Sequence, residues 1–304
     1  MDIYLPVAEM PVNLLWLLAL GGLIGFLSGM FGVGGGFLLT PVLILMGIPP
    51  PVAVGSQTAQ ILASSVSGVL AHLRRRTVDF KMGYVLVAGG MAGSAFGVWL
   101  FGVLMRLGQI DLFVSLGYVV FLGAVGALML VESLGAIWRS RRPATARGVR
   151  PPRPHWGHRW PWKMRFPQSR LSISILIPLL VGAFGGLLAA ILGIGGGFVM
   201  VPAMIYLIGM PTAVVVGTSL FQIAFVAAIS GFLHAYTNHS VDILLALLLI
   251  VGGAVGAQYG TRFGGRLKAE HMRILLATMV LLVCGKLAYD LVTPPHEPYS
   301  LSAE

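Results

Sequence analysis

Apolar segments separated by short polar ones cover almost the whole chain. The longest are residues 52–73, 82–104, 112–134, 212–233, 242–263 and 271–292. Each is close to the roughly 20 residues that an α-helix needs to cross a bilayer. Residues 242–260 are apolar on every face, whereas a membrane β-strand alternates apolar and polar positions. The pattern therefore predicts an all-α polytopic membrane protein.

The two halves of the chain repeat each other in sequence. The segment Gly-Val-Gly-Gly-Gly-Phe-Leu-Leu-Thr-Pro, which begins at Gly32, returns as Gly-Ile-Gly-Gly-Gly-Phe-Val-Met-Val-Pro from Gly193. Further matched pairs follow in the same order: Gln60 and Gln222, His72 and His234, Asp79 and Asp242, and Gly89-Gly90 and Gly252-Gly253. Self-similarity of this extent indicates a duplication. We therefore predict two homologous transmembrane repeats, residues 1–137 and 171–304.

A basic, proline-rich segment joins the two repeats at residues 138–170. It carries half of the 20 Lys and Arg residues of a chain whose net charge is +10, and no Asp or Glu occurs between Glu132 and Asp242. Basic loops between spans face the cytoplasm and attract anionic lipid headgroups. The segment is therefore predicted to be a cytoplasmic linker that contacts membrane lipids, not nucleic acid. The alternative is a membrane scaffold or assembly factor that holds a partner through this linker.

Each repeat starts with an apolar segment, residues 12–31 or 172–192, which meets the glycines and continues into a short apolar piece, residues 37–46 or 198–208. An odd number of crossings per repeat gives inverted repeats, and an even number gives parallel ones. The odd number puts the basic loop after Arg262 inside and the Lys/Arg-free N-terminal tail outside, as the positive-inside tendency favours. We therefore expect inverted repeats with both termini periplasmic. Each repeat would contain a glycine-broken helix hairpin, re-entrant or made of two short crossings, and three transmembrane helices.

The glycine clusters are predicted to break helices inside the membrane. Each glycine costs a helix about 1 kcal/mol relative to Ala, and bare backbone is tolerated at that depth only where it faces protein or a polar cavity. The helix that restarts offers unpaired N–H groups and the positive end of its dipole, which suit an anion. Paired broken helices form the substrate site in inverted-repeat transporters. The predicted substrate-binding residues are Gly34, Gly35, Gly36, Phe37, Pro41, Gly195, Gly196, Gly197, Phe198 and Pro202.

Glycines and glutamines in membrane helices also have purely structural uses. Glycines allow close helix packing, which we expect of Gly21, Gly25 and Gly29. Gln60 and Gln222 occupy equivalent positions, and an amide in hydrocarbon needs a hydrogen-bond partner. That partner is either a neighbouring helix or an anion, and we include both glutamines among the predicted substrate-binding residues.

The chain lacks the side-chain combinations that catalysis or metal binding requires. It has one cysteine, Cys284, no HExxH motif or nucleophile elbow, and no paired carboxylates within an apolar segment. We therefore expect no enzyme activity, no metal site and no cofactor. Because no carboxylate lies near the middle of a span, an anion could leave the cell by facilitated efflux, driven by the inside-negative membrane potential.

The doubled Gly-x-Gly-Gly-Gly-Phe-x-x-x-Pro motif resembles that of the sulfite exporter TauE/SafE family, also called the toluene sulfonate uptake permease family. The resemblance covers nearly the whole chain except the linker, which is longer and richer in arginine than expected of the family, and the tails. It implies a multi-pass transporter of the bacterial inner membrane that moves small sulfur-containing anions such as sulfite or organosulfonates, usually outward. The positions that match the motif are Gly32, Gly34, Gly35, Gly36, Phe37 and Pro41, with Gly193, Gly195, Gly196, Gly197, Phe198 and Pro202.

Overall fold

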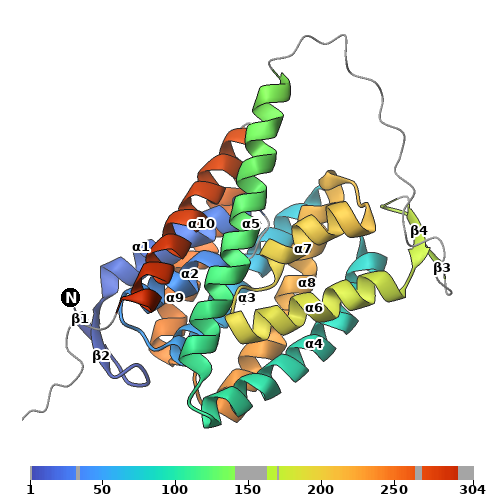
Figure 1. Cartoon of the computed structure of the whole chain (residues 1–304). Helices are drawn as coiled ribbons and strands as arrows, with labels where there is room; N and C mark the ends of the chain where they lie inside the picture. The colour runs from blue at the N-terminus through green and yellow to red at the C-terminus, as the bar shows by residue number, and fades with distance from the viewer. Residues whose placement is uncertain (1, 32–34, 141–162, 170, 264–268, 294–304) are drawn as a thin grey trace, which may run out of the picture.

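The computed structural model describes residues 2–31, 35–140, 163–169, 171–263 and 269–293 (Figure 1). The first half contains helices α1 (Leu14–Phe31), α2 (Gly36–Leu45), α3 (Pro50–Arg74), α4 (Phe80–Arg106) and α5 (Ile110–Ser140). The second half contains α6 (Leu176–Leu192), α7 (Gly197–Ala203), the π-helical turn η3 (Met204–Ile208), α8 (Thr212–Leu233), the π-helical turn η4 (His234–Asn238), α9 (Ile243–Phe263) and α10 (Ala269–Val292). Most of the predicted linker lies outside the described residues.

A short β-hairpin precedes the first helix of each half. Strand β1 (Asp2–Leu5) pairs antiparallel with β2 (Met10–Asn13), and β3 (Lys163–Phe166) pairs antiparallel with β4 (Leu171–Ser174). These hairpins are not predicted from the sequence, because strands of four residues carry too little alternation to stand out. Strand β3 falls within residues 138–170, so this end of the predicted linker has regular structure.

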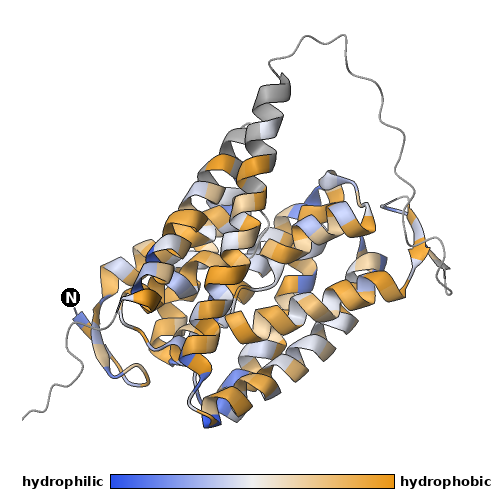
Figure 2. Cartoon of the chain, viewed as in Figure 1, coloured by the Kyte–Doolittle hydropathy of each residue, from blue (hydrophilic) through white to orange (hydrophobic). Residues whose placement is uncertain are grey.

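The mainly helical, apolar character predicted from the sequence is confirmed. Within the described residues, four helices are long and apolar enough to cross a membrane, namely Phe80–Arg106, Ile110–Leu128, Thr212–Asn238 and Ile243–Phe263. Helices α1, α2 and α6 are apolar but shorter. Helix α3 has 25 residues and is more polar, because it buries several hydroxyl and amide side chains inside the protein. Figure 2 shows apolar residues spread over the whole helical bundle.

The first helix of each half packs against the other half. Helix α1 lies along α9 and helix α6 lies along α4, while α3 packs against α8 and α5 against α10 (Figure 1). In the α1–α9 and α4–α6 pairs the helix backbones lie very close together. A Cβ on Gly25 would lie 2.3 Å from the carbonyl oxygen of Gly253, and one on Gly93 would lie 1.9 Å from that of Ala183. Only residues without a side chain fit such contacts. The packing role expected of the glycines on α1 is therefore confirmed.

Asp79 joins three elements at the start of α4. Its Oδ1 accepts a hydrogen bond from the backbone N–H of Met82 at 3.2 Å, which caps the helix. Its Oδ2 accepts from the backbone N–H of Ser169 at 3.0 Å and from the Ser169 hydroxyl at 2.6 Å, in the turn between β3 and β4. Its own N–H donates to Thr218 Oγ1 near the start of α8 at 3.0 Å. The beginnings of α4 and α8 therefore lie together, beside the second hairpin.

Asp242 makes the equivalent junction at the start of α9. Its Oδ1 accepts from the backbone N–H groups of Leu244 and Leu245, and its Oδ2 accepts from that of Val7 in the turn between β1 and β2 at 2.9 Å. The N–H of Asp242 donates to Ser56 Oγ on α3 at 2.8 Å. The beginnings of α3 and α9 therefore lie together, beside the first hairpin.

Candidate functional site

The helix breaks predicted at the glycine motifs are present. Gly35 has a φ of 72° just before α2, and Gly193, Gly195 and Gly196 have φ values of 65°, 68° and 72° between α6 and α7. Side chains strongly disfavour these left-handed conformations, so glycine allows the chain to stop one helix and begin another within a few residues. Gly34 lies outside the described residues.

The two broken helices meet at the interface between the halves. The rings of Phe37 on α2 and Phe198 on α7 are stacked, with centroids 4.7 Å apart and planes 15° apart. Beside them, a Cβ on Gly36 would lie 2.4 Å from the carbonyl oxygen of Gly193. Residues from the two copies of the motif, far apart in the sequence, are therefore in direct contact, and this contact is tightly packed.

Both prolines of the motif lie inside the restarted helices. Pro41 is buried within α2, and Pro202 is half-buried within α7. Proline lacks an N–H and cannot complete the regular helical ladder. In the second half the α-helix ends at Ala203 and continues as the π-helical turn η3, whereas α2 stays α-helical past its proline.

Two side chains of the first half hold the break between α6 and α7. The hydroxyl of Tyr118 on α5 donates to the carbonyl oxygen of Leu192, and Nε2 of Gln57 on α3 donates to that of Gly193. The last carbonyls of a helix have no partner within the helix, so these two donors satisfy the end of α6. Neither residue is among the predicted substrate-binding residues, because no repeat or motif singles out Tyr118, and Gln57 stands out only as a possible hydrogen-bond donor beside Gln60.

Gln60 and Gln222 are fully buried at equivalent positions of α3 and α8. Within the part of the chain that the structure describes, neither the amide nitrogen nor the amide oxygen of either side chain has a hydrogen-bond partner. Glycines make the room for them, since a Cβ on Gly253 of α9 would lie 2.7 Å from Gln60 Cγ, and one on Gly90 of α4 would lie 2.8 Å from Gln222 Nε2. The interhelical hydrogen bonds considered in the sequence analysis are therefore not present at either glutamine.

An unpartnered buried amide costs a protein about 1–3 kcal/mol, so a pair of them at equivalent positions requires an explanation. Amide N–H groups donate hydrogen bonds without bringing charge into the membrane. Both glutamines are thus available to a ligand that accepts hydrogen bonds.

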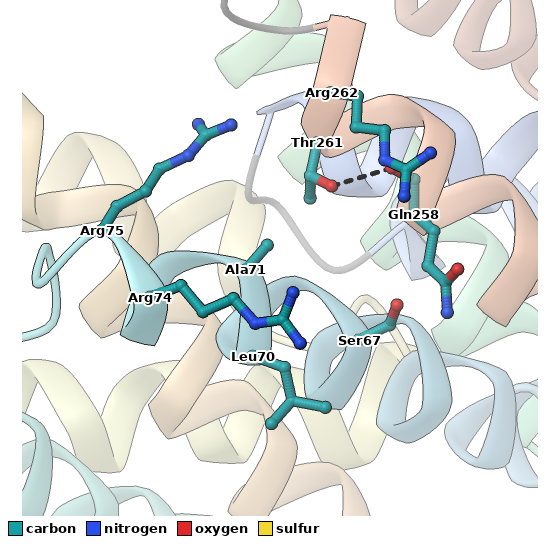
Figure 3. Close-up of a pocket in the computed structure, with 8 residues that line it drawn as sticks. All are labelled: Ser67, Leu70, Ala71, Arg74, Arg75, Gln258, Thr261 and Arg262. Carbon is teal, nitrogen blue, oxygen red and sulfur yellow. Dashed lines mark hydrogen bonds between the residues drawn. The ribbon is translucent and has the colours of Figure 1, made fainter.

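A cavity of about 460 Å³ opens between the C-terminal ends of α3 and α9 (Figure 3). It is lined by Ser67, Leu70, Ala71, Arg74, Arg75, Gln258, Thr261 and Arg262, and we call it the arginine cavity. On α3, positions 60, 64, 67, 71 and 74 follow at spacings of three and four and so share one helix face. The same face therefore carries Gln60 at depth and the lining of the cavity at its end. None of the described residues of the two glycine motifs lines the cavity.

The sequence analysis does not identify the arginine cavity. Its arginines stand at the ends of apolar segments, where basic residues are expected on the cytoplasmic side for reasons of topology alone. A signal was present in the polar face of α3, because Gln60, Ser64, Ser67 and Arg74 recur at helical spacing inside an otherwise apolar segment.

The helical membrane fold and the doubled broken helix define the class of the protein as a multi-pass membrane transporter, and comparison with known proteins gives the family. The model of the sulfite exporter TauE/SafE family matches residues 17–287, and the chain belongs to this family. The family and the relatives found are membrane transporters, not enzymes.

Several relatives match over most of their length. The probable membrane transporter protein YjnA of Bacillus subtilis is 28% identical over 269 residues, which are 88% of this chain and 96% of the relative. YunE of the same organism is 28% identical over 286 residues, covering 90% and 97% of the two chains. A probable membrane transporter protein of Xylella fastidiosa is 30% identical over 253 residues, covering 82% and 84%. No solved structure matches the chain.

Proposed function

We propose that this protein exports a small sulfur-containing anion, such as sulfite or an organosulfonate, across the bacterial inner membrane. The observation that carries the proposal is the pair of buried, unpartnered amides of Gln60 and Gln222. They lie on the two helices that follow the broken hairpins, and each faces a glycine of the other half. Membership of the sulfite exporter TauE/SafE family supports a sulfur anion as the substrate class.

The proposed binding site lies between the two glycine-broken helices. It comprises Gly34, Gly35, Gly36, Phe37, Pro41 and Gln60 from the first half, and Gly195, Gly196, Gly197, Phe198, Pro202 and Gln222 from the second. Oxyanions accept several hydrogen bonds, and the N–H groups at the start of α2 together with the amide donors of the glutamines match that need. The stacked rings of Phe37 and Phe198 close the site in this conformation, so the anion enters when the two broken helices move apart.

The two halves are proposed to cross the membrane in opposite senses, as inverted repeats 1–137 and 171–304 joined by the linker 138–170. Two hydrogen bonds support this arrangement. Thr218 binds Asp79, so α8 begins on the side where α3 ends and α4 begins. Ser56 binds Asp242, so α3 begins on the side where α8 ends and α9 begins. With Arg74, Arg75 and Arg76 on the cytoplasmic side, the first hairpin and both termini are then periplasmic.

Export requires no coupled ion in this proposal. An inside-negative potential contributes about 2.3 kcal/mol per elementary charge per 100 mV to the exit of an anion. The described carboxylates Asp79 and Asp242 are engaged in capping helices, which leaves neither of them free as a proton carrier in the middle of a span.

Flux in proteoliposomes tests the proposal directly. Purified protein is reconstituted, radiolabelled sulfite or toluenesulfonate is loaded inside, and efflux is measured with and without an imposed potential. We expect saturable efflux of at least one anion that accelerates when the potential drives anions outward. Absence of protein-dependent flux for every anion tried, with the protein shown to be folded and inserted, would overturn the proposal.

The scaffold alternative is separated by deleting residues 143–160, which leaves strand β3 and the contact of Ser169 with Asp79 in place. A transporter keeps its anion flux after this deletion. A scaffold that acts through the linker loses its cellular phenotype and shows no flux before or after the deletion.

A further inference from the structure

The arginine cavity gathers positive charge that no carboxylate of the described residues pairs with. Arg74, Arg75 and Arg262 line it together with the polar side chains of Gln258 and Thr261. Figure 3 shows the side chain of Arg74 extending toward Ser67 and Gln258, with Arg262 on the opposite helix. Among the described residues, none of the three arginines forms an ion pair with a carboxylate. A guanidinium group presents planar, paired N–H donors that match an oxyanion.

The repeat supplies an internal comparison, because the equivalent end of the second half has a different lining. Aligning Gln60 with Gln222 on the central helices, and Gly253 with Gly90 on their neighbours, gives the counterpart of each polar lining position. These counterparts are Ile229, Tyr236, Thr237, Ala95, Val98 and Trp99. The three arginines of the cavity thus correspond to Tyr236, Thr237 and Trp99. The positive lining is therefore not inherited from the duplicated unit but belongs to one end of the molecule.

At that opposite end the residue matched to His72 is buried. The imidazole of His234 is buried, with Nε2 2.9 Å from the carbonyl oxygen of Ala190, and its ring packs edge-on against Phe101 at 4.7 Å. The positively lined cavity at the end of α3 and α9 thus has no equivalent set of arginines at the end of α8 and α4.

A polar row leads from the cavity to the buried glutamine of the first half. Ser67 lines the cavity, and its hydroxyl is buried without a hydrogen-bond partner among the described residues. One turn deeper on the same face is Ser64, whose hydroxyl lies 3.5 Å from that of Ser28 on α1. Gln60 follows one turn below Ser64. Hydroxyl and amide groups therefore occupy this face from the mouth to the proposed binding site.

We infer that the arginine cavity is an entry site that binds a small oxyanion before the anion reaches Gln60. The inference rests on the proposed function and adds to it a capture site at one end of the protein. Three guanidinium groups that line one cavity raise the local concentration of anions and accelerate their entry. The ligand class is a singly or doubly charged free oxyanion of the size of sulfite. A phosphate of an anionic lipid offers the same chemistry and is distinguished by the experiment.

The experiment uses the double variant Arg74→Gln/Arg262→Gln in liposomes of phosphatidylcholine alone. Sulfite is presented to one side at a time. Protein molecules inserted in one of the two orientations are blocked with a membrane-impermeant reagent, so that only the other orientation contributes flux. We expect the variant to lose about tenfold in initial flux at low sulfite from the arginine side, with a similar maximal rate and unchanged flux from the other side. The flux of the variant should also depend less on salt than that of the wild type, because the interaction lost is electrostatic.

Arg106→Gln is the matched control, because Arg106 is an exposed arginine in the last turn of α4 and does not line the cavity. If the arginines only stabilised their helix ends, the double variant would have a lower thermal unfolding midpoint and an unchanged concentration dependence of flux. Replacing Arg74 with Lys instead of Gln keeps the positive charge and should retain most of the wild-type flux.

Three outcomes overturn the inference. The double variant matches the wild type at every sulfite concentration, or Arg106→Gln has the same effect as the double variant. The third is that flux and its loss in the variant appear only when anionic lipid is added, which assigns the cavity to a lipid headgroup.

If the wild type transports no anion, the proposed function fails, and equilibrium dialysis of radiolabelled sulfite against protein in zwitterionic nanodiscs decides the inference separately. Binding that the double variant loses supports the capture site. Absence of binding by the wild type overturns it.

Discussion

The hydroxyl of Ser56 on α3 accepts a hydrogen bond from the backbone N–H of Asp242 at 2.8 Å, across 186 positions of sequence. Thr218 and Asp79 form the counterpart of this pair at 3.0 Å. In each pair a buried helix of one half satisfies the backbone at the start of a helix in the other half. The two hydroxyls therefore stabilise the assembly of the halves as well as the local turn.

Removing either hydroxyl should destabilise the protein. Ser56→Ala and Thr218→Val each leave a buried N–H without its partner, which costs about 1–3 kcal/mol. The measurement is the thermal unfolding midpoint in detergent, which should fall for both variants. Thr237→Val is the control, because the Thr237 hydroxyl donates to Leu233 at an exposed position. Midpoints equal to that of the control would contradict the prediction.

The contact between the two glycine motifs should not tolerate a methyl group. In Gly36→Ala the new Cβ would lie 2.4 Å from both the carbonyl oxygen of Gly193 and Cδ1 of Ile61. Overpacking of this kind costs about 1–3 kcal/mol, and it would also push the broken helices apart. We expect a lower unfolding midpoint and impaired anion flux. Gly135→Ala on α5 meets no atom within 4 Å and should be neutral or slightly stabilising.

Replacing the buried glutamines should separate stability from transport. Gln60→Leu and Gln222→Leu remove amides that have no partner among the described residues, so the midpoint should stay constant or rise. Anion flux should fall by about tenfold or more, since a lost hydrogen bond to a charged ligand is worth about 1.5–3 kcal/mol. Gln109→Leu, at an exposed position before α5, should change neither quantity. A destabilised Gln60→Leu protein with normal flux would mean that the amides serve structure.

The opposed orientation of the halves can be tested with single cysteines. Cys284→Ser leaves a chain without cysteine, since Cys284 is its only one. In that background, Thr237→Cys after α8 should react with an impermeant maleimide added outside intact cells, whereas Phe263→Cys at the end of α9 should react only after permeabilisation. Parallel halves reverse both results.

Much of the proposed site is predicted from the sequence because the duplication marks it. Phe37 and Phe198 occupy the same place in the two copies, and a pair related in this way meets when the copies pack about a common axis. Gln60 and Gln222 stand out for the same reason, as amides in apolar segments. The roles of Gln57 and Tyr118 at the end of α6 are not predicted, because only the three-dimensional contacts with Gly193 and Leu192 reveal them.

The charge pattern predicts sidedness but not a cavity. Arg74 and Arg262 stand at the ends of segments nearly 190 residues apart, and only the packing of α3 against α9 brings them to one opening. The predicted linker stays a prediction, since most of it lies outside the described residues, and its basic residues add nothing to this opening in the part of the chain that the structure describes.

The exchange of first helices has a mechanical consequence. Helix α1 contacts α9, and α6 contacts α4, through bare backbone at glycines that leave no room for a methyl group, so a small separation of either pair would lose these close contacts. A hinge motion that keeps these two helix pairs together moves α1 with the C-terminal part of the chain and α6 with the N-terminal part. Each rigid unit that moves in this way contains helices from both repeats. Neither repeat on its own would therefore encode one of these units.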